Sequence, residues 1–87
     1  MEITNYNRTT DGSVLLEFAD KVRYLMLVEL REALESKFGV AARLTISHDL
    51  PTISLRTMDD TPLPEDENPE IFVAFARGWF YAMRRRQ

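Results

Sequence analysis

The sequence predicts an α+β fold, a two-layer sandwich in which two helices cover one face of a four-stranded, mostly antiparallel sheet. Four short segments alternate apolar and polar residues with the period of a strand, and two longer segments place apolar residues at helical spacing. The segments follow one another in the order ββαββα. Because the chain has 87 residues, 45% of them hydrophobic and 29% charged, we expect a single compact domain over residues 1–87.

The first predicted hairpin consists of residues 2–8 and 13–19. Between these segments lies Asp11-Gly12, a turn sequence in which glycine supplies the positive φ of a tight hairpin. The apolar residues at positions 14, 16 and 18 alternate with their neighbours and predict one inward face. A short apolar run is also compatible with a helix, so a helix that starts near Ser13 and continues into the next segment is the alternative.

A helix is predicted between Asp20, a suitable N-cap, and Gly39, a natural C′ residue. In its N-terminal half, Tyr24, Leu27 and Val28 add a second apolar side to the helix. We therefore expect that half to be covered from two directions. The residues at helical spacing that predict the core face are Val22, Leu25, Met26, Leu30, Ala33, Leu34 and Phe38.

The second predicted hairpin consists of residues 43–48 and 52–57, joined at residues 49–51. Both segments alternate polar and apolar residues, as strands with one solvated face do. The side chains expected to point to the core are Leu44, Ile46, Ile53 and Leu55. The next residues, 59–69, are predicted to form an acidic loop, because their prolines disfavour both a helix and a central strand.

The terminal helix has clear start and end signals. Asn68 can cap its free amides, Pro69 has the φ of a first helical residue, and Glu70 places a carboxylate at the positive end of the helix dipole. The basic residues that complement the negative end are Arg84, Arg85 and Arg86.

This terminal helix carries more apolar side chains than one buried face requires. One face at helical spacing consists of Phe72, Phe75, Ala76, Trp79 and Met83, and the apolar residues outside it are Ile71, Val73, Phe80 and Tyr81. Left in water, these side chains would form a patch on the order of a few hundred Å², typical of a binding surface. The predicted protein-binding residues are Phe72, Phe75, Arg77, Trp79, Phe80 and Tyr81, with Tyr24 and Leu27 of the first helix.

Two alternatives compete with this interpretation of the apolar surplus. The helices can pack tightly on each other and on a curved sheet, which would hide the excess inside the molecule. Aromatic residues followed by three arginines also suit a helix that lies on an anionic membrane surface. The net charge of −3 argues against membrane binding. A membrane span is not predicted, because Arg23, Glu29 and Arg77 interrupt the apolar stretches.

Charge is distributed unevenly along the C-terminal third of the chain. The acidic loop contains Asp59, Asp60, Glu65, Asp66 and Glu67 and no basic residue. In the structural interpretation these acids solvate the loop, and the terminal arginines stabilise the helix end. In the functional interpretation the acids steer a basic partner, and Arg84, Arg85 and Arg86 contact phosphates of a nucleic acid.

No pattern in the sequence predicts catalysis, a metal site, a cofactor or a small-molecule substrate. His48 is the only histidine and stands beside Asp49, but no recurring carboxylate spacing completes a metal site or a triad around it. The three glycines are too sparse for a phosphate-binding loop. The chain has no cysteine, and residues 1–5 do not resemble a secretory signal, so we expect a cytoplasmic protein.

The sequence thus predicts a small, non-enzymatic protein that acts by stoichiometric association. It would form a homodimer, or serve as an inhibitor or adaptor of a larger protein. Its size and acidity would suit a protein encoded by a phage or another mobile element. The alternative is a dimeric nucleic-acid-binding regulator that uses the C-terminal arginines.

Overall fold

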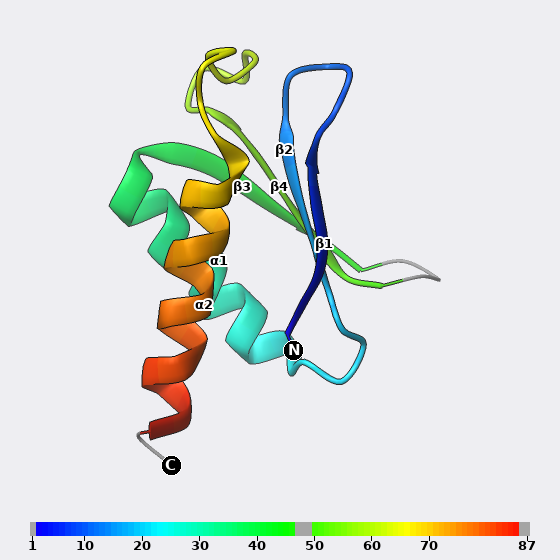
Figure 1. Ribbon diagram of the computed structural model, residues 1–87, viewed down its shortest axis with the longest axis vertical. Helices are drawn as coiled ribbons and strands as arrows, with labels where there is room; N and C mark the ends of the chain where they lie inside the picture. The colour runs from blue at the N-terminus through cyan, green and yellow to red at the C-terminus, as the bar shows by residue number, and fades with distance from the viewer. Residues whose placement is uncertain (1, 47–49, 86–87) are drawn as a thin grey trace.

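The computed structural model describes residues 2–46 and 50–85 and confirms the predicted fold class. The described chain forms a four-stranded antiparallel sheet in the order β1-β2-β4-β3, with two helices on one face (Figure 1). Pairing of β2 with β4 joins the two hairpins into one sheet. The elements are β1 (Ile3–Arg8), β2 (Val14–Phe18), α1 (Tyr24–Phe38), β3 (Val40–Thr45), β4 (Thr52–Thr57) and α2 (Pro69–Arg85).

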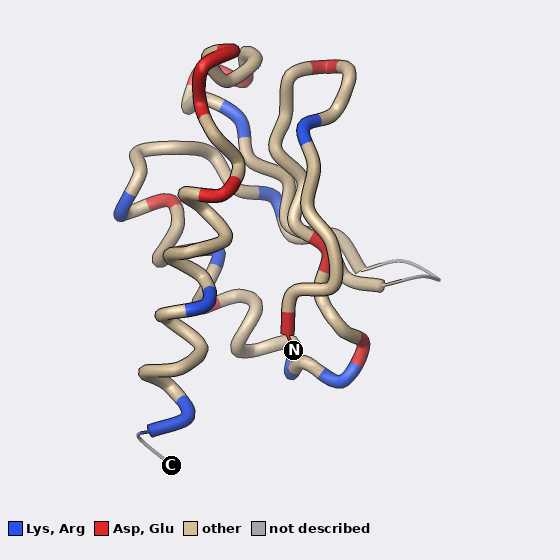
Figure 2. The backbone as a smooth tube through the Cα atoms, viewed as in Figure 1, with Lys and Arg blue, Asp and Glu red and all other residues tan. Residues whose placement is uncertain are grey.

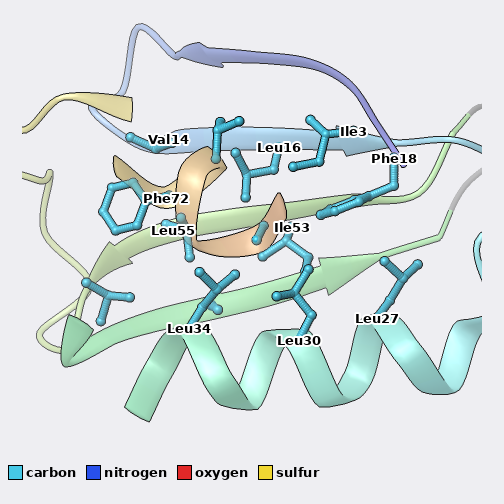
Figure 3. Close-up of a cluster of buried hydrophobic side chains, with 14 of the residues drawn as sticks. Ile3, Val14, Leu16, Phe18, Leu27, Leu30, Leu34, Ile53, Leu55 and Phe72 are labelled. Atoms are coloured by element: carbon cyan, nitrogen blue, oxygen red, sulfur yellow. The ribbon is translucent and has the colours of Figure 1, made fainter. Parts of the chain in front are cut away.

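The core lies between the sheet and the helices (Figure 3). Across the β2–β4 ladder, Leu16 is opposite Ile53 and Val14 is opposite Leu55. Burying each aliphatic side chain of this kind contributes about 1.5–3 kcal/mol, so this row holds the two hairpins together. The fully buried side chains of the two central strands are Val14, Leu16, Phe18, Ile53 and Leu55.

The two helices run in opposite directions over this face (Figure 1). Aromatic contacts join them to each other and to the sheet: the ring centroids of Phe38 and Phe72 are 4.8 Å apart, and those of Phe18 and Phe80 are 6.1 Å apart. The buried residues of α1 are Leu27, Leu30 and Leu34, which point toward the sheet in Figure 3. The buried residues of α2 are Phe72, Val73, Ala76 and Phe80.

The turn between β1 and β2 has the predicted form. Gly12 has a φ of 86°, and a Cβ at this position would overlap the side chain of Pro62. Residues 14–18 pair with β1 on one side and with β4 on the other, as a central strand. The alternative of a helix from Ser13 is therefore wrong.

Helix α1 begins later than the sequence predicted, and the prediction of Asp20 as its N-cap is wrong. The chain is still held against β1 after β2 ends, because the Ala19 N–H donates to the Glu2 carbonyl at 2.8 Å. A turn follows, and the helix begins at Tyr24 with Arg23 in the N-cap position and no capping side chain.

The structure also differs from the sequence prediction in which residues of α1 face the core. Leu25 was expected in the core but is 72% exposed, whereas Leu27 is 1% exposed. Two residues correspond to a rotation of about 200° around a helix, so only one of this pair can face the sheet. Leu27 lies in the same row as Leu30 and Leu34, at spacings of three and four residues, and this row occupies the buried side.

Strand β3 is displaced toward the N-terminus from its predicted range. Gly39 ends α1 as predicted, with a φ of 65° and its N–H bonded to the Glu35 carbonyl at 2.9 Å, and the chain enters the strand directly at Val40. The prediction of Ile46 as a core residue is wrong, because it follows the last strand residue and is 55% exposed. His48 and Asp49 lie outside the described residues.

The segment between β4 and α2 is anchored to the first hairpin. Leu63 is buried, and its N–H donates to the Gly12 carbonyl at 3.0 Å. The helix then starts as predicted, because Asn68 Oδ1 accepts the Glu70 N–H at 3.0 Å. This anchoring fixes where the N-terminal end of α2 lies on the sheet.

On each edge strand of the sheet, a side chain accepts a hydrogen bond from a backbone N–H that has no partner strand. On the β3 edge, the Ala42 N–H donates to Glu35 Oε2 at 3.1 Å. On the β1 edge, the Tyr6 N–H donates to Asn5 Oδ1 at 2.9 Å. Groups satisfied in this way are unavailable to a strand of another chain, so these contacts disfavour association through the edges.

Candidate functional site

Three residues that the sequence assigned to a protein-binding surface lie in the core, so this part of the prediction is wrong. Leu27, Phe72 and Phe80 are buried, and their side chains contact the sheet or the opposite helix. On α2 the buried row is Phe72, Ala76 and Phe80, with Val73 beside it. These side chains lie on one side of the helix at i, i+4 spacing, and that side faces the sheet.

The other residues predicted to bind protein lie at the surface to different extents. Tyr24 on α1 and Tyr81 on α2 are more than half exposed. Phe75 and Trp79 are half-buried against the core, and the Phe75 ring lies 5.5 Å from the Phe38 ring. Arg77 is exposed on the outer side of α2. The surface is therefore apolar, but narrower on α2 than predicted.

A groove opens where the N-terminal end of α1 meets the C-terminal end of α2, and we call it the α1–α2 groove. Its volume is about 360 Å³, and its lining residues are Arg23, Tyr24, Leu25, Met26, Glu29 and Met83. Four of these six side chains are apolar or aromatic, and Tyr24 and Leu25 are 59% and 72% exposed. Exposed side chains of α1 and the half-buried Met83 of α2 thus meet at the groove.

A second hollow adjoins the α1–α2 groove and shares Arg23 and Met26 with it. Its volume is about 260 Å³. Arg84 lies in its wall and forms an ion pair with Glu2 at 3.4 Å, which links the end of α2 to the start of β1. The lining residues of this hollow are Glu2, Lys21, Val22, Arg23, Met26, Phe80 and Arg84.

Along α2, a row of apolar side chains leads to the groove. Ile71, Phe75, Trp79 and Met83 follow one another at i, i+4 spacing and therefore lie side by side on the helix. Ile71 is half exposed, the next three are half-buried, and Met83 lines the groove. We call these four residues the α2 row.

Sequence reasoning missed the residues at the centre of this surface. It assigned Leu25 to the core face of the first helix, and it did not include Met83 or Met26 among the binding residues, although Met26 both packs against the core and lines the groove. Leu25 is five and nine residues from Leu30 and Leu34, so it lies on the other side of the helix. The unbroken spacing of Leu27, Leu30 and Leu34 was the signal that identifies the core side and leaves Leu25 outside it.

The acidic loop lies before the N-terminal end of α2 (Figure 2), whereas the groove is lined by Met83 near the C-terminal end of that helix. Asp59, Glu65 and Asp66 are exposed. Asp60, with a φ of 62°, forms an ion pair with Arg56 at 3.0 Å, and the Glu67 carbonyl accepts a hydrogen bond from Arg8 at 3.4 Å. Part of the loop therefore stabilises the fold.

Two of the three terminal arginines make contacts within the molecule. Arg84 pairs with Glu2, and Arg85 donates to the Tyr81 hydroxyl at 3.3 Å while its guanidinium lies 5.7 Å from the centre of the Tyr81 ring. Arg86, the third residue of the predicted nucleic-acid contact, lies outside the described residues. Arg84 and Arg85 therefore have partners within the molecule, and their arrangement does not indicate a phosphate-binding site.

A larger hollow, about 530 Å³, lies on the outer face of the sheet near the β1–β2 turn. Its main charged group, Arg56, donates to Ser13 Oγ at 3.0 Å and forms an ion pair with Asp11 at 3.3 Å. Its Nε makes no hydrogen bond but lies 3.0 Å from Asp60 Oδ1, so charge attraction holds it there. Four of the residues that line the hollow, Asp11, Ser13, Arg56 and Asp60, are thus joined to one another.

Asp11 belongs to the same network. A hydrogen bond from the Thr9 hydroxyl, further hydrogen bonds from the backbone and side chain of Ser13, and the positive charge of Arg56 hold the pKa of Asp11 below its ordinary value of 3.8. Asp11 is therefore ionised at neutral pH, and it closes the β1–β2 turn from the solvent side.

A scan against protein-family models, a search of curated proteins and a search of solved structures each found no match to this chain. Neither described helix is long and apolar enough to cross a membrane. Within residues 2–46 and 50–85, no three acidic or histidine side chains come together in a way that could hold a metal ion. The α1–α2 groove and the α2 row are therefore judged on their geometry and chemistry alone.

Proposed function

We propose that this protein is a binding module that associates stoichiometrically with another protein through the α1–α2 groove and the α2 row. The observation that carries the proposal is the groove itself, in which Tyr24 and Leu25 extend into water above Met26 and Met83. Tyrosine, methionine and arginine are residue types enriched in protein interfaces, and the groove contains all three.

The energetics indicate how much surface a partner has to cover. Burying two exposed side chains such as Tyr24 and Leu25 contributes about 1.5–3 kcal/mol each. Association costs on the order of 4–15 kcal/mol in lost translational and rotational freedom, so these two residues alone cannot hold a complex. A partner that also covers the α2 row would add apolar area from Ile71, Phe75 and Trp79.

The biological setting stays a prediction from the sequence. An inhibitor or adaptor of a larger protein, or a homodimer, would each use such a surface, and the cytoplasmic location and the phage or mobile-element origin rest on composition alone. The nucleic-acid alternative has no observation of its own in its favour, because Arg84 and Arg85 are engaged with Glu2 and Tyr81.

The proposal is tested by selecting binders from a library of random 16-residue peptides on the immobilised protein. Two variants then locate the binding site. Leu25→Glu places a charge in the α1–α2 groove, and Met58→Glu places the same charge at the far end of the molecule, on a side chain that is 69% exposed against 72% for Leu25. Both variants should fold, because neither residue is in the core.

We expect the selected peptides to lose at least tenfold in affinity for Leu25→Glu and to bind Met58→Glu as they bind the wild type. Equal losses with both variants would show that the peptides respond to exposed apolar side chains in general. Unchanged affinity for Leu25→Glu would overturn the proposed site.

A further inference from the structure

Beyond the existence of a binding surface, its chemistry points to the kind of partner. We propose that the α1–α2 groove binds an acidic amphipathic peptide segment, in which leucine, phenylalanine or similar residues alternate with aspartate and glutamate. This inference rests on the proposed function, and it adds the composition of the segment that the groove accepts. Three observations support it: the apolar floor, the charges at the rim, and the place of the groove in the charge distribution of the whole molecule.

The floor of the groove suits apolar side chains of an adaptable segment. Met26 and Met83 come from different helices and meet there. The methionine side chain is unbranched and has several rotatable bonds, so it can follow side chains of different shapes. Leu25 and Tyr24 add exposed apolar surface to the same wall.

Two cationic side chains without an ion pair in the described chain lie in the hollow beside this floor. Lys21 and Arg23 line the second hollow, both are exposed, and neither forms an ion pair with any residue in the described ranges. Arg84 also lines it, but Glu2 neutralises its charge at 3.4 Å. A carboxylate of a bound segment would find two free cations at this end of the groove, and the Arg23 guanidinium can bind it with two hydrogen bonds.

One acid in the groove gives the segment a direction. Glu29 is six residues from Arg23, which corresponds to about 9 Å along the axis of a helix. The acidic residues of a bound segment should therefore lie at the Lys21 and Arg23 end, with an apolar or basic residue near Glu29.

The groove is far from the acidic loop, and this distance favours the groove over the loop as the place where an acidic segment binds. The protein has a net charge of −3, and the acidic loop lies before the start of α2, whereas the groove lies near its end (Figure 2). From Pro69 to Met83 the helix spans about 21 Å, more than twice the screening length of about 8 Å at physiological salt. The acidic loop therefore repels an acidic segment at its own end without cancelling the attraction at the groove.

The test uses the same random 16-residue library, read for composition, followed by matched synthetic peptides. For the strongest binder, one version keeps its Asp and Glu residues, a second replaces them with Asn and Gln, and a third replaces them with Lys. Each is measured by fluorescence anisotropy at about 50 and 300 mM salt against the wild type, the double variant Lys21→Glu with Arg23→Glu, and the double variant Arg43→Glu with Lys37→Glu. The last pair makes the same charge change on exposed side chains that do not line the groove.

We expect the selected peptides to be enriched in acidic and apolar residues. The acidic version should bind the wild type at least tenfold more tightly than the Lys version does, and its affinity should fall as the salt concentration rises. Its affinity should also fall at least tenfold for the Lys21 and Arg23 variant. For the Arg43 and Lys37 variant its affinity should change little. A selected set that is neutral or basic and still loses affinity for Leu25→Glu would overturn the acidic preference and leave the proposed function standing.

Other outcomes are equally informative. Peptides that are acidic but insensitive to Leu25→Glu, Lys21→Glu and Arg23→Glu would bind elsewhere, which would contradict both the inference and the proposed site. A wild-type protein that self-associates in light scattering, and that the Leu25→Glu variant turns into a monomer, would show that a second copy occupies the groove. The acidic peptide would then have to compete with that copy for the inference to stand.

Discussion

The two outer surfaces of the sandwich differ in the contacts that their side chains make within the molecule. On the outer face of the sheet, Arg56 is held by Asp11, Ser13 and Asp60. On the outer surface of the helices, Tyr24 and Leu25 extend into water. The contacts of Arg56 therefore stabilise the fold on the sheet side, whereas the helix side exposes apolar surface that the described chain does not cover.

The largest expected difference lies within α2 itself and tests which of its sides belongs to the core. Phe72→Ala should lower the free energy of unfolding by about 3–5 kcal/mol, because it leaves a cavity among fully buried side chains. Tyr81→Ala, on the exposed side, should change it by less than about 1 kcal/mol. Urea denaturation of both variants makes the comparison, and similar losses for both would mean that the helix is rotated from the described orientation.

The next difference compares two arginines, one on each surface. Arg56→Ala removes hydrogen bonds and ion pairs that join the β1–β2 turn to the end of β4 and should destabilise the fold by about 1–2 kcal/mol. Arg23→Ala removes an exposed side chain that forms no ion pair within the described residues, and it should cost less than about 0.5 kcal/mol. If Arg23→Ala proved as costly as Arg56→Ala, Arg23 would be a structural residue and not a free cation at the groove.

Two glycines give opposite expectations for the same substitution. Gly12→Ala combines a φ of 86° with an overlap against Pro62, so it should destabilise the protein by about 1–3 kcal/mol. Gly78→Ala lies in a helix with open space around the new Cβ and should stabilise it by up to about 1 kcal/mol. Thermal unfolding of the two variants measures whether each substitution raises or lowers stability. A destabilised Gly78→Ala variant would indicate that another group packs against this position.

The smallest effect concerns pH. The pKa of Asp11 is lowered in the folded protein, so its contribution to stability is present above its ordinary pKa of 3.8 and is lost as the pH falls through the lower, folded value. Asp11→Asn should therefore be less stable than the wild type at pH 7 and equally stable near pH 2. A stability difference that persists at pH 2 would mean that the carboxylate charge is not its source.

The sequence was sufficient to predict the order of the elements, because each local signal was strong. Asp11-Gly12, Gly39 and Asn68-Pro69 mark the turn, the end of α1 and the start of α2, and all three act as expected. These signals depend on backbone chemistry within a few residues, which a sequence shows directly.

The surface could be predicted only in part, because rotation of a helix about its axis depends on tertiary packing. The N–H of Ala19 donates to the carbonyl of Glu2, which precedes β1 and is distant in sequence, and α1 begins only at Tyr24. Leu25 then lies on the outer side of the helix. On α2, the sequence showed a surplus of apolar residues correctly but could not tell that Phe72 and Phe80, and not Phe75 and Trp79, face the sheet.

The most direct test of the proposed binding site is to map where a selected peptide contacts the protein. Amide chemical shifts of the ¹⁵N-labelled protein would be followed as the peptide is added. We expect shifts at the N-terminal end of α1 and along the C-terminal half of α2, around Leu25 and Met83, with little change on the outer face of the sheet near Arg43 and Arg56. Shifts concentrated on that sheet face, with none around Leu25 and Met83, would contradict the proposed binding site.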